Sequence, residues 1–259
     1  MASPRRGPPA RPSYFVTQES ALGRLIVFSG AGLSAESGLA TFRGSDGLWN
    51  GYRIEDVCYF PSWRRNFHQV HDFYNQRRVE LGRAEPNAAH RQIAEWQRRY
   101  LTVLLTQNVD DLLERAGCQD VVHLHGVLRE MHCTACDHVW DIGYSAFAPA
   151  ETPCPAPGCG TREGVKPNIR FFGEICPLYE TLQDTIEDLT PQDVVVVMGT
   201  SLQVIPMHHF LTGRPSFNIL ANLDPAEDPH GLDPFDVSLI GPATRTVREI
   251  DTILRDRLG

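Results

Sequence analysis

Six short apolar runs divide this chain of 259 residues and leave few folds open to it. The runs are Leu25–Ser29, Leu101–Thr106, Val121–Leu124, Asp193–Met198, Phe217–Leu220 and Val237–Ile240. Strands that are apolar along their whole length are buried on both faces, as in parallel sheets that helices cover on each side. The stretches between the runs have helical spacing, and strands that alternate with helices predict an α/β fold with a doubly wound parallel sheet.

Helices are predicted between these strands from spacing and from capping residues. After Pro61, apolar side chains recur at helical intervals as Phe67, Val70, Phe73, Tyr74 and Leu81. Asn87 and Asp110 are residue types that cap helix N-termini, so each is expected to start a helix. A last helix is expected from about Val247 to Leu258.

Charge and hydropathy argue against two classes of protein. No apolar run approaches the roughly 18–20 residues of a membrane-spanning helix. The formal net charge of −8 is unsuited to electrostatic binding of nucleic acid. Met1 to Ser13 is rich in arginine and proline but has no apolar core, so it is not a secretory signal. A transit peptide is one interpretation of this composition, and we expect instead a disordered tail over residues 1–20.

Two cysteine pairs interrupt the α/β pattern. Cys133 and Cys136 are separated by two residues and Cys154 and Cys159 by four, with prolines and turn residues around them. Two such thiolate pairs form a tetrahedral shell of four sulfurs that suits Zn²⁺, and a shell without an open position indicates a structural zinc. We therefore expect an inserted zinc module over about residues 129–167. The odd total of seven cysteines argues against a closed disulfide framework and favours a cytoplasmic protein.

A glycine-rich loop follows the first apolar run. Gly30, Gly32 and Ala35 match the G-x-G-x-x-G/A pattern of dinucleotide-binding turns. Gly32 would let a pyrophosphate approach the backbone, and the helix that follows would present N–H donors. The acidic residue that dehydrogenases carry ~20 positions later is not cleanly placed, so this is not an ordinary dehydrogenase fingerprint. A glycine-rich turn without a ligand has the same pattern.

Polar side chains end the second and third strands. Gln107, Asn108 and Asp110 follow one strand and His125 follows the next, at the edge where open α/β sheets bind ligands. Helix capping accounts for Asp110 alone. An imidazole at the place of His125 is suited to accept a proton near neutral pH, although most of the ten histidines are expected to be structural.

In combination, these segments resemble the sirtuin family of NAD-dependent protein lysine deacylases. The segments that carry the resemblance are Gly30–Gly38, Thr41–Arg43, Thr106–Asp110, His125-Gly126, the four cysteines, Phe172–Glu174, Gly199–Ser201, Asn222-Leu223 and Gly241–Ala243. The resemblance implies a catalytic domain over residues 21–259, with a Rossmann-like NAD-binding part at about 21–50, 85–128 and 170–259 and a helical module at about 51–84.

The resemblance also implies which residues bind and react. NAD would be held by Gly30, Ala31, Gly32, Ser34, Glu36, Phe42, Arg43, Trp49, Gln107, Asn108, Val109, Asp110, Gly199, Thr200, Ser201, Asn222, Leu223, Asp224 and Ala243. In sirtuins the acyl-lysine oxygen attacks the ribose of NAD as nicotinamide leaves, a histidine takes a proton from a ribose hydroxyl, and the acyl group ends on ADP-ribose. His125 and Asn108 would be the catalytic residues. The substrate would be an acyl-lysine protein or peptide, extended as an added strand near Phe172–Glu174, and the enzyme a monomer.

The acyl group is indicated by a pair on the predicted helix after Pro61. Tyr74 and Arg77 are three residues apart and share a face, where a phenol and a guanidinium could bind a carboxylate. A surface aromatic beside a solvated arginine has the same spacing. The chain is similar to class III sirtuins, which carry this pair and remove succinyl and malonyl groups, and whose bacterial members also remove acetyl. Thr41 agrees with that class.

Some positions depart from the class III pattern. Ala40 stands where proline is usual, and Cys58 stands where alanine lines the acyl pocket. Lys166–Phe171 replaces a more apolar segment that contacts peptide, and Met207 replaces a small residue. Two alternatives remain beside deacylation: a protein mono-ADP-ribosyltransferase on the same scaffold, and a non-catalytic regulator that senses NAD.

Overall fold

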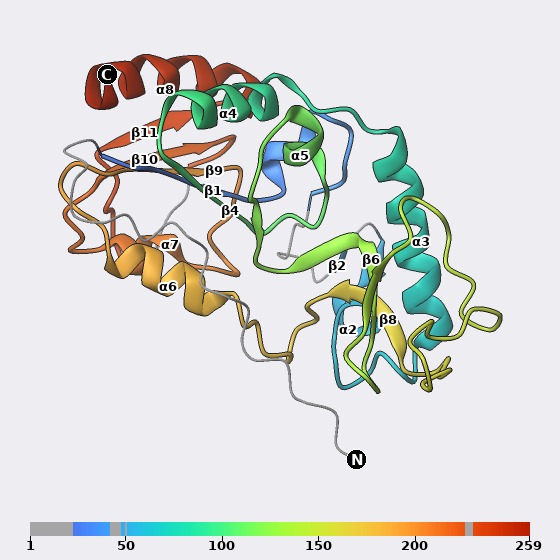
Figure 1. The fold of residues 1–259 in the computed structure, drawn as a ribbon. Coiled ribbons are helices and arrows are strands. Elements are labelled where there is room, and N and C mark those ends of the chain that lie inside the picture. Colours follow the sequence, from blue (N-terminus) through green and yellow to red (C-terminus); the bar gives the residue numbers. More distant parts are fainter. Residues whose placement is uncertain (1–22, 42–47, 50, 226–229) are drawn as a thin grey trace.

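A parallel sheet lies at the centre of the protein (Figure 1). The computed structural model describes residues 23–41, 48–49, 51–225 and 230–259. The sheet consists of β1 (Leu25–Ser29), β4 (Thr102–Thr106), β5 (Val122–His123), β9 (Val194–Met198), β10 (Phe217–Asn222) and β11 (Val237–Ile240). The strands pair in the order β11-β10-β9-β1-β4-β5, all parallel. Each predicted apolar run forms one of these strands, which confirms the predicted fold class.

Helices cover both faces of the sheet. α4 (Ala88–Arg99) and α8 (Ala243–Leu258) lie on one face, and α6 (Tyr179–Glu187) and α7 (Met207–Leu211) lie on the other (Figure 1). Within the part of the chain that the structure describes, no helix is both long enough and apolar enough to cross a membrane.

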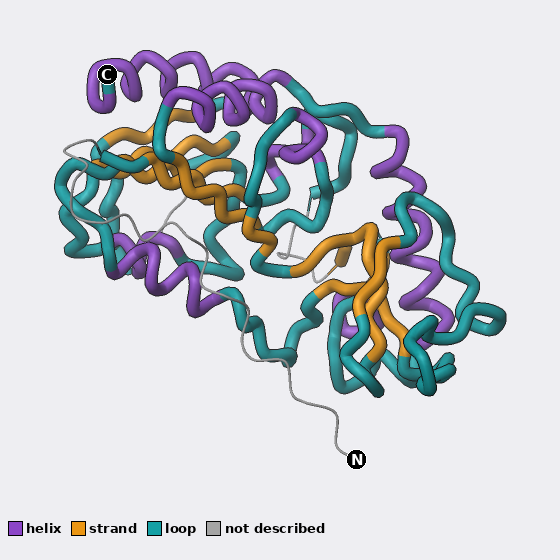
Figure 2. The backbone as a smooth tube through the Cα atoms, in the orientation of Figure 1, coloured by secondary structure: helices purple, strands orange, loops and turns teal. Residues whose placement is uncertain are grey.

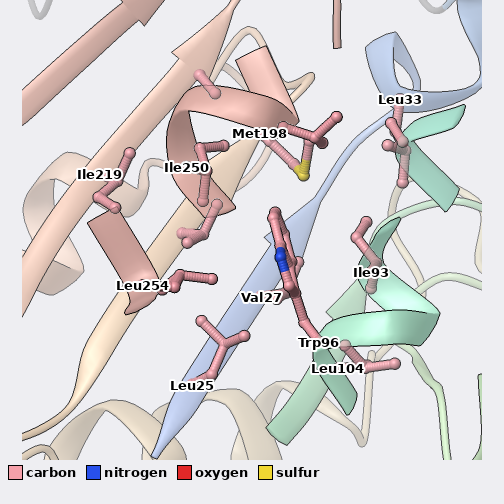
Figure 3. Packing of buried hydrophobic residues seen from close by; sticks show 14 of the residues in the cluster. Leu25, Val27, Leu33, Ile93, Trp96, Leu104, Met198, Ile219, Ile250 and Leu254 are labelled. Atoms are coloured by element: carbon pink, nitrogen blue, oxygen red, sulfur yellow. The ribbon is translucent and has the colours of Figure 1, made fainter. Parts of the chain in front are cut away.

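The side chains of β1 are divided between two hydrophobic cores. Leu25 and Val27 pack beside Trp96 on the side of α4 and α8 (Figure 3). Ile26 and Phe28 belong to the core on the side of α6 and α7. Because side chains alternate between the two faces of a strand, a strand buried on both faces is apolar at every position.

The start of α4 is the cap that the sequence predicts. Asn87 Oδ1 accepts hydrogen bonds from the N–H groups of Ala89 at 2.9 Å and His90 at 3.3 Å. His90 Nδ1 accepts one in return from the Asn87 N–H at 3.2 Å. Burial lowers the pKa of His90 to about 4, so the ring is neutral and can accept. This reciprocal capping box gives partners to N–H groups that the helix itself leaves unpaired.

Two further modules lie side by side next to the main sheet (Figure 2). One is built on α3 (Phe67–Arg83), the helix predicted after Pro61. The other is an antiparallel sheet of β6 (Gly126–Cys133), β7 (Val139–Asp141) and β8 (Val165–Ile169). The remaining elements are short: α1 (Gly32–Ala35), β2 (Leu48–Trp49), β3 (Tyr52–Arg53), α2 (Ile54–Val57) and α5 (Leu112–Ala116).

Two predicted helix starts differ from the structure. The last helix begins at Ala243 rather than Val247, because Glu36 caps it from far away in the sequence: its carboxylate accepts bonds from the Thr244 N–H at 3.0 Å and Oγ1 at 2.7 Å. α5 has Asp111 at its N-cap position, although the Asp110 carboxylate does accept from the Leu112 N–H at 3.2 Å.

Candidate active site

The loop after β1 packs closely against the loop after β9. The order of the strands reverses at this point of the sheet, since β1 has β4 on one side and β9 on the other. The Gly32 N–H donates to Gly199 O at 2.7 Å, and the Gly30 N–H donates to Met198 O at 3.0 Å. A Cβ atom on Gly30 or Gly32 would lie 2.8 Å from the Gly199 backbone. The contact between the loops therefore requires both glycines, and it leaves the first loop at the crevice where such sheets bind ligands.

A polar network joins the loop after β1 to the loop after β4. Ser34 Oγ donates to Asp110 Oδ2 at 2.8 Å and accepts from Asn108 Nδ2 at 3.2 Å. One level deeper, Ser29 Oγ donates to Thr106 Oγ1 at 2.9 Å. Burial raises the pKa of Asp110 above its ordinary value. The structure thus brings together three of the predicted site residues in one hydrogen-bonded cluster.

The loops after β9 and β10 extend this network. Gln107 Nε2 donates to Thr200 Oγ1 at 3.0 Å. The Asn222 amide forms two bonds with the backbone of Thr200, accepting from its N–H at 3.0 Å and donating to its carbonyl at 2.7 Å. The carboxyl ends of four neighbouring strands therefore carry a continuous polar edge.

His125 lies beside this edge, after β5. Its Nε2 is 2.7 Å from the Tyr179 hydroxyl, and its ring also bonds the backbone of Gln107. Burial lowers the pKa of His125 below its ordinary value, so the ring is neutral near pH 7. A neutral imidazole with an available lone pair can act as a general base.

Sequence reasoning missed His123, which supports the site from behind. Its Nδ1 bonds the Asn108 carbonyl at 2.8 Å, and its Nε2 bonds Glu114 Oε1 at 2.7 Å. Burial alone would lower the pKa of His123, but the Glu114 carboxylate outweighs burial and raises it. The charged ring then holds the Asn108 backbone in place. Nothing in the spacing of the sequence distinguishes His123 from the other residues of its strand.

Several predicted residues lie away from the polar cluster or outside the described structure. The Glu36 carboxylate is occupied by Thr244, as given above. Leu223 is 59% exposed, and Ser201 and Asp224 are also exposed. Phe42 and Arg43 lie outside the described residues, and for Trp49 the structure describes the backbone in β2 and not the side chain. Ala31, Val109 and Ala243 are only half-buried.

A second site is formed around α3. Tyr74 and Arg77 are 0% and 8% exposed, so the face that they share points inward and the pair is not a solvated surface feature. The Tyr74 ring stacks on Phe171 with centroids 5.8 Å apart, and its hydroxyl interacts with the Cys58 thiol. Burial raises the pKa of Cys58 to about 11, so the thiol is neutral. Arg77 Nη2 donates to Glu80 Oε1 at 2.8 Å.

A buried ion pair adjoins this second site. Lys166, the only lysine of the chain, is 1% exposed, and its Nζ is 3.0 Å from Glu174 Oε2 and 4.2 Å from the centre of the Phe171 ring. Burial lowers its pKa. The same Glu174 atom accepts from the Phe171 N–H at 2.7 Å. Glu174 is thus bonded both to Lys166 and to the Phe171 backbone, which fixes the shape of the loop after β8.

The backbone of that loop is already paired in part. The Phe172 N–H donates to Cys58 O at 2.9 Å, and Phe172 O accepts from the Phe60 N–H at 3.0 Å. A peptide that adds as a strand here must use backbone groups other than those of Phe172.

The four paired cysteines meet in the antiparallel module. Their sulfurs all lie within 4.8 Å of one another, with Cys133 and Cys159 at 3.7 Å and Cys136 and Cys154 at 3.6 Å. A tetrahedral zinc with Zn–S bonds of about 2.3 Å places its sulfurs about 3.8 Å apart. The donor set therefore fits Zn²⁺ with no position left open. His132, which lies near these cysteines, bonds Asp137 instead.

Comparisons with known proteins agree with this geometry. Residues 30–206 match the sequence model of the Sir2 family. An NAD-dependent protein deacylase of Helicobacter hepaticus is 40% identical over 250 residues, which is 88% of this chain and 96% of that protein. One of Caulobacter vibrioides is 41% identical over 234 residues, or 86% and 93%.

Solved structures give the same result. A complex of a Sir2 homologue with NAD has a TM-score of 0.76 at 36% identity, over 92% of both chains. A mutant Sir2 homologue in complex with ADP-ribose has a TM-score of 0.79 at 35% identity, over 91% of this chain and 93% of that one.

Proposed function

The chain belongs to the Sir2 family, and we propose that it is an NAD-dependent protein deacylase that removes succinyl, malonyl and acetyl groups from lysine. Four side chains at the carboxyl edge of the sheet carry the proposal. Asn108 and Asp110 are both bonded to Ser34, and His125 is bonded to the backbone of Gln107 beside them. Two hydrogen-bonding side chains, a carboxylate and a neutral imidazole thus converge at the ligand-binding edge of the fold.

The co-substrate side is assigned to the polar edge. Gly30 to Gly32, Ser34 and Gly199 to Ser201 would hold the phosphates and the adenosine side, and Asn222 would frame the adenine. When bound, NAD supplies a ribose carbon that receives the acyl oxygen and a nicotinamide that leaves. Asn108 and Asp110 would orient the ribose and the nicotinamide, because their side chains are fixed by Ser34.

His125 is assigned as the base. Its neutral ring can take a proton from a ribose hydroxyl at Nε2, after which that hydroxyl oxygen is free to attack the acyl carbon. Its lowered pKa keeps the ring unprotonated at neutral pH. The backbone of Gln107 holds the ring on its other side.

Tyr74 and Arg77 are assigned to the acyl group. Both are buried on the inner face of α3, so a carboxylate that reaches them leaves water and meets a guanidinium able to donate two parallel bonds. Glu80 already accepts from Arg77, so an acyl carboxylate would share or displace that partner. Acetyl-lysine has no carboxylate and does not need the pair.

The cysteine cluster is assigned a structural zinc. Cys133 ends β6 and the other three cysteines lie in the loops that connect β6, β7 and β8, and α3 packs against β6 and β8. The metal would therefore stabilise the support of the acyl site and take no part in the reaction. Binding of substrate in an extended form, a cytoplasmic location and a monomeric state remain predictions from the sequence.

The test uses one peptide that carries succinyl-lysine or acetyl-lysine, with released lysine measured by mass spectrometry with and without NAD. In Arg77→Met, we expect desuccinylation to fall roughly 10- to 150-fold, which is the value of hydrogen bonds to a charged group, while deacetylation persists. Arg83→Met is the matched control, since Arg83 is exposed on the same helix.

Each other outcome rejects a stated part of the proposal. Deacetylation without desuccinylation in the wild type would reject the carboxylate site and keep the deacylase. ADP-ribosylated protein without acyl-ADP-ribose would replace the deacylase by the mono-ADP-ribosyltransferase. NAD binding without any product would leave the NAD-sensing regulator.

A further inference from the structure

A tyrosine outside every segment that carries the family resemblance occupies the reactive nitrogen of His125. Tyr179 is the first residue of α6, and its hydroxyl lies 2.7 Å from His125 Nε2. The two ring planes meet at 49°, with centroids 5.9 Å apart. The phenol therefore reaches the nitrogen by its hydroxyl, as a hydrogen bond requires, and does not stack on the ring.

The direction of this hydrogen bond follows from the neighbours of the ring. The carbonyl of Gln107 can only accept, so the proton of the neutral imidazole faces Gln107 and Nε2 carries the lone pair. Tyr179 therefore donates. Burial raises the pKa of Tyr179, which agrees with a phenol that keeps its proton.

One lone pair can accept one strong hydrogen bond. As a base, His125 needs Nε2 to receive the proton of a ribose hydroxyl, and Tyr179 already donates to that atom. The ribose hydroxyl and the phenol cannot both be bonded there. Occupation of the site must break the contact with Tyr179.

We propose that Tyr179 is a positioning residue that holds Nε2 of His125 in the ligand-free enzyme and is displaced by a ribose hydroxyl of the co-substrate. The proposal rests on the function proposed above for His125. In the ligand-free enzyme the phenol donates to the lone pair at Nε2 of the tautomer that Gln107 sets. Binding of the ribose then exchanges one donor for another at the same atom.

The place of Tyr179 links this exchange to the peptide side of the site. Its N–H donates to Cys176 O at 3.0 Å, so α6 starts directly from the loop that contains Glu174 and Ile175. Ile175 is 84% exposed on that loop, and Glu174 is fixed by Lys166. The residue that the ribose displaces is thus the end of the segment expected to meet the peptide.

The experiment compares wild type with Tyr179→Phe, which removes only the hydroxyl. ADP-ribose, which carries the ribose without nicotinamide, is titrated by calorimetry, and kcat and the KM for NAD are measured at saturating acyl-peptide. We expect ADP-ribose affinity to rise about 2- to 10-fold and the KM for NAD to fall by the same factor, with kcat unchanged, because one net hydrogen bond no longer has to be broken.

Two controls isolate the contact. Tyr100→Phe removes a tyrosine hydroxyl that bonds Arg99, within the core beside α8, and should leave ADP-ribose affinity unchanged. In a His125→Ala background, Tyr179→Phe should also leave it unchanged, because the nitrogen for which the two hydroxyls compete is absent. Thermal melting verifies that each variant is folded.

Other results overturn the proposal. A fall in kcat with unchanged affinity would mean that Tyr179 only braces the ring. Unchanged affinity and unchanged kcat would mean that the contact has no role, and a gain of affinity that persists in His125→Ala would mean that it acts through another residue. If the wild type releases no acyl group, the proposed function fails, whereas the ADP-ribose titration still decides on Tyr179.

Discussion

The edge of the central sheet and the buried second site around Tyr74 hold their polar groups in different ways. At the edge, the Ser34 hydroxyl bonds both Asn108 and Asp110, and only Asp110 among the three is ionisable. In the second site, Arg77 and Lys166 are buried cations, each with a glutamate partner. Under the proposed function, the contacts at the edge would serve every acyl substrate, and the buried charges would distinguish one acyl group from another.

The two regions also differ in the free energy that is lost when a polar group gives up its internal partner. A neutral hydrogen-bond network loses little when it exchanges an internal partner for a ligand. A buried cation without its partner is strongly destabilising, so Arg77 and Lys166 would keep their glutamate partners until the proposed acyl carboxylate binds. Variants at the polar edge should therefore change the deacylation rate of all acyl peptides alike. Variants in the second site should change the preference between acyl groups or the stability of the protein.

The largest effect is expected at the edge. His125→Ala should lower the deacylation rate by about 10²- to 10⁴-fold, the usual contribution of a general base, and by the same factor for succinyl and acetyl peptides. Initial rates on both peptides measure it, with His68→Ala, an exposed histidine of α3, as the control. Loss of one activity alone would mean that His125 belongs to the acyl pocket and not to the common chemistry.

The second-largest effect is a loss of protein stability when the buried pair of Lys166 and Glu174 is broken. Lys166→Met leaves the Glu174 carboxylate buried without its ammonium partner, which should lower the free energy of unfolding by about 3–5 kcal/mol. Urea denaturation measures it. Arg53→Met, which breaks the exposed pair with Glu55, is the control and should change stability by less than about 1 kcal/mol. Equal effects would show that burial does not distinguish the two pairs.

Two aspartates with opposite pKa shifts test what buried carboxylates contribute to stability. Asp193 directly precedes β9, at the end of the sheet opposite the polar edge, and Asp110 lies at that edge. Burial would raise the pKa of Asp193, but bonds from the Arg24 side chain and from backbone N–H groups outweigh it and hold that pKa below its ordinary value. Its stabilising contribution is therefore present above an unfolded pKa of about 3.8 and is lost as pH falls through the lower folded value. Asp193→Asn should lower the free energy of unfolding at pH 7 by about 1–3 kcal/mol.

Asp110 should behave in the opposite way. Its pKa is raised by burial, so its stabilising contribution is present below the unfolded pKa and is lost as pH rises through the folded value. Asp110→Asn should therefore raise the unfolding midpoint at pH 7 while it weakens ADP-ribose binding. Urea denaturation of both variants provides the comparison, and the same sign for the two would contradict it.

The smallest effect is a displacement along the pH axis. Because burial lowers the pKa of His125, the ring stays an active base at pH values where an ordinary histidine is protonated. In a plot of kcat/KM against pH, the acid inflection should lie below 6.5, the ordinary value. An inflection above 6.5 would contradict a buried, neutral base.

The edge of the sheet could be predicted from the sequence because parallel strands end together. Once six apolar runs are taken as neighbouring strands, Asn108 and His125 have to lie at one edge. The Asn87 cap and the cysteine pairs are equally local signals, since each depends on residues a few positions apart. The resemblance to sirtuins supplied the roles, and the geometry supplied the contacts.

The supports of the site could not be predicted, because they join distant parts of the chain. His123 acts on Asn108 across two strands, and Tyr179 reaches His125 from a helix 54 residues later. The early start of α8 depends on Glu36, which lies 208 positions before Thr244. No spacing rule connects such residues, so only the folded chain reveals them.

The burial of Lys166 has a consequence for the handling of this protein. Activated esters and acyl thioesters react with amines that solvent can reach, and the only lysine side chain of this protein is 1% exposed. Amine-directed dyes, cross-linkers and stray acylation should therefore leave its side chains unmodified. The positive charge of its surface is carried by arginine, which such reagents do not neutralise.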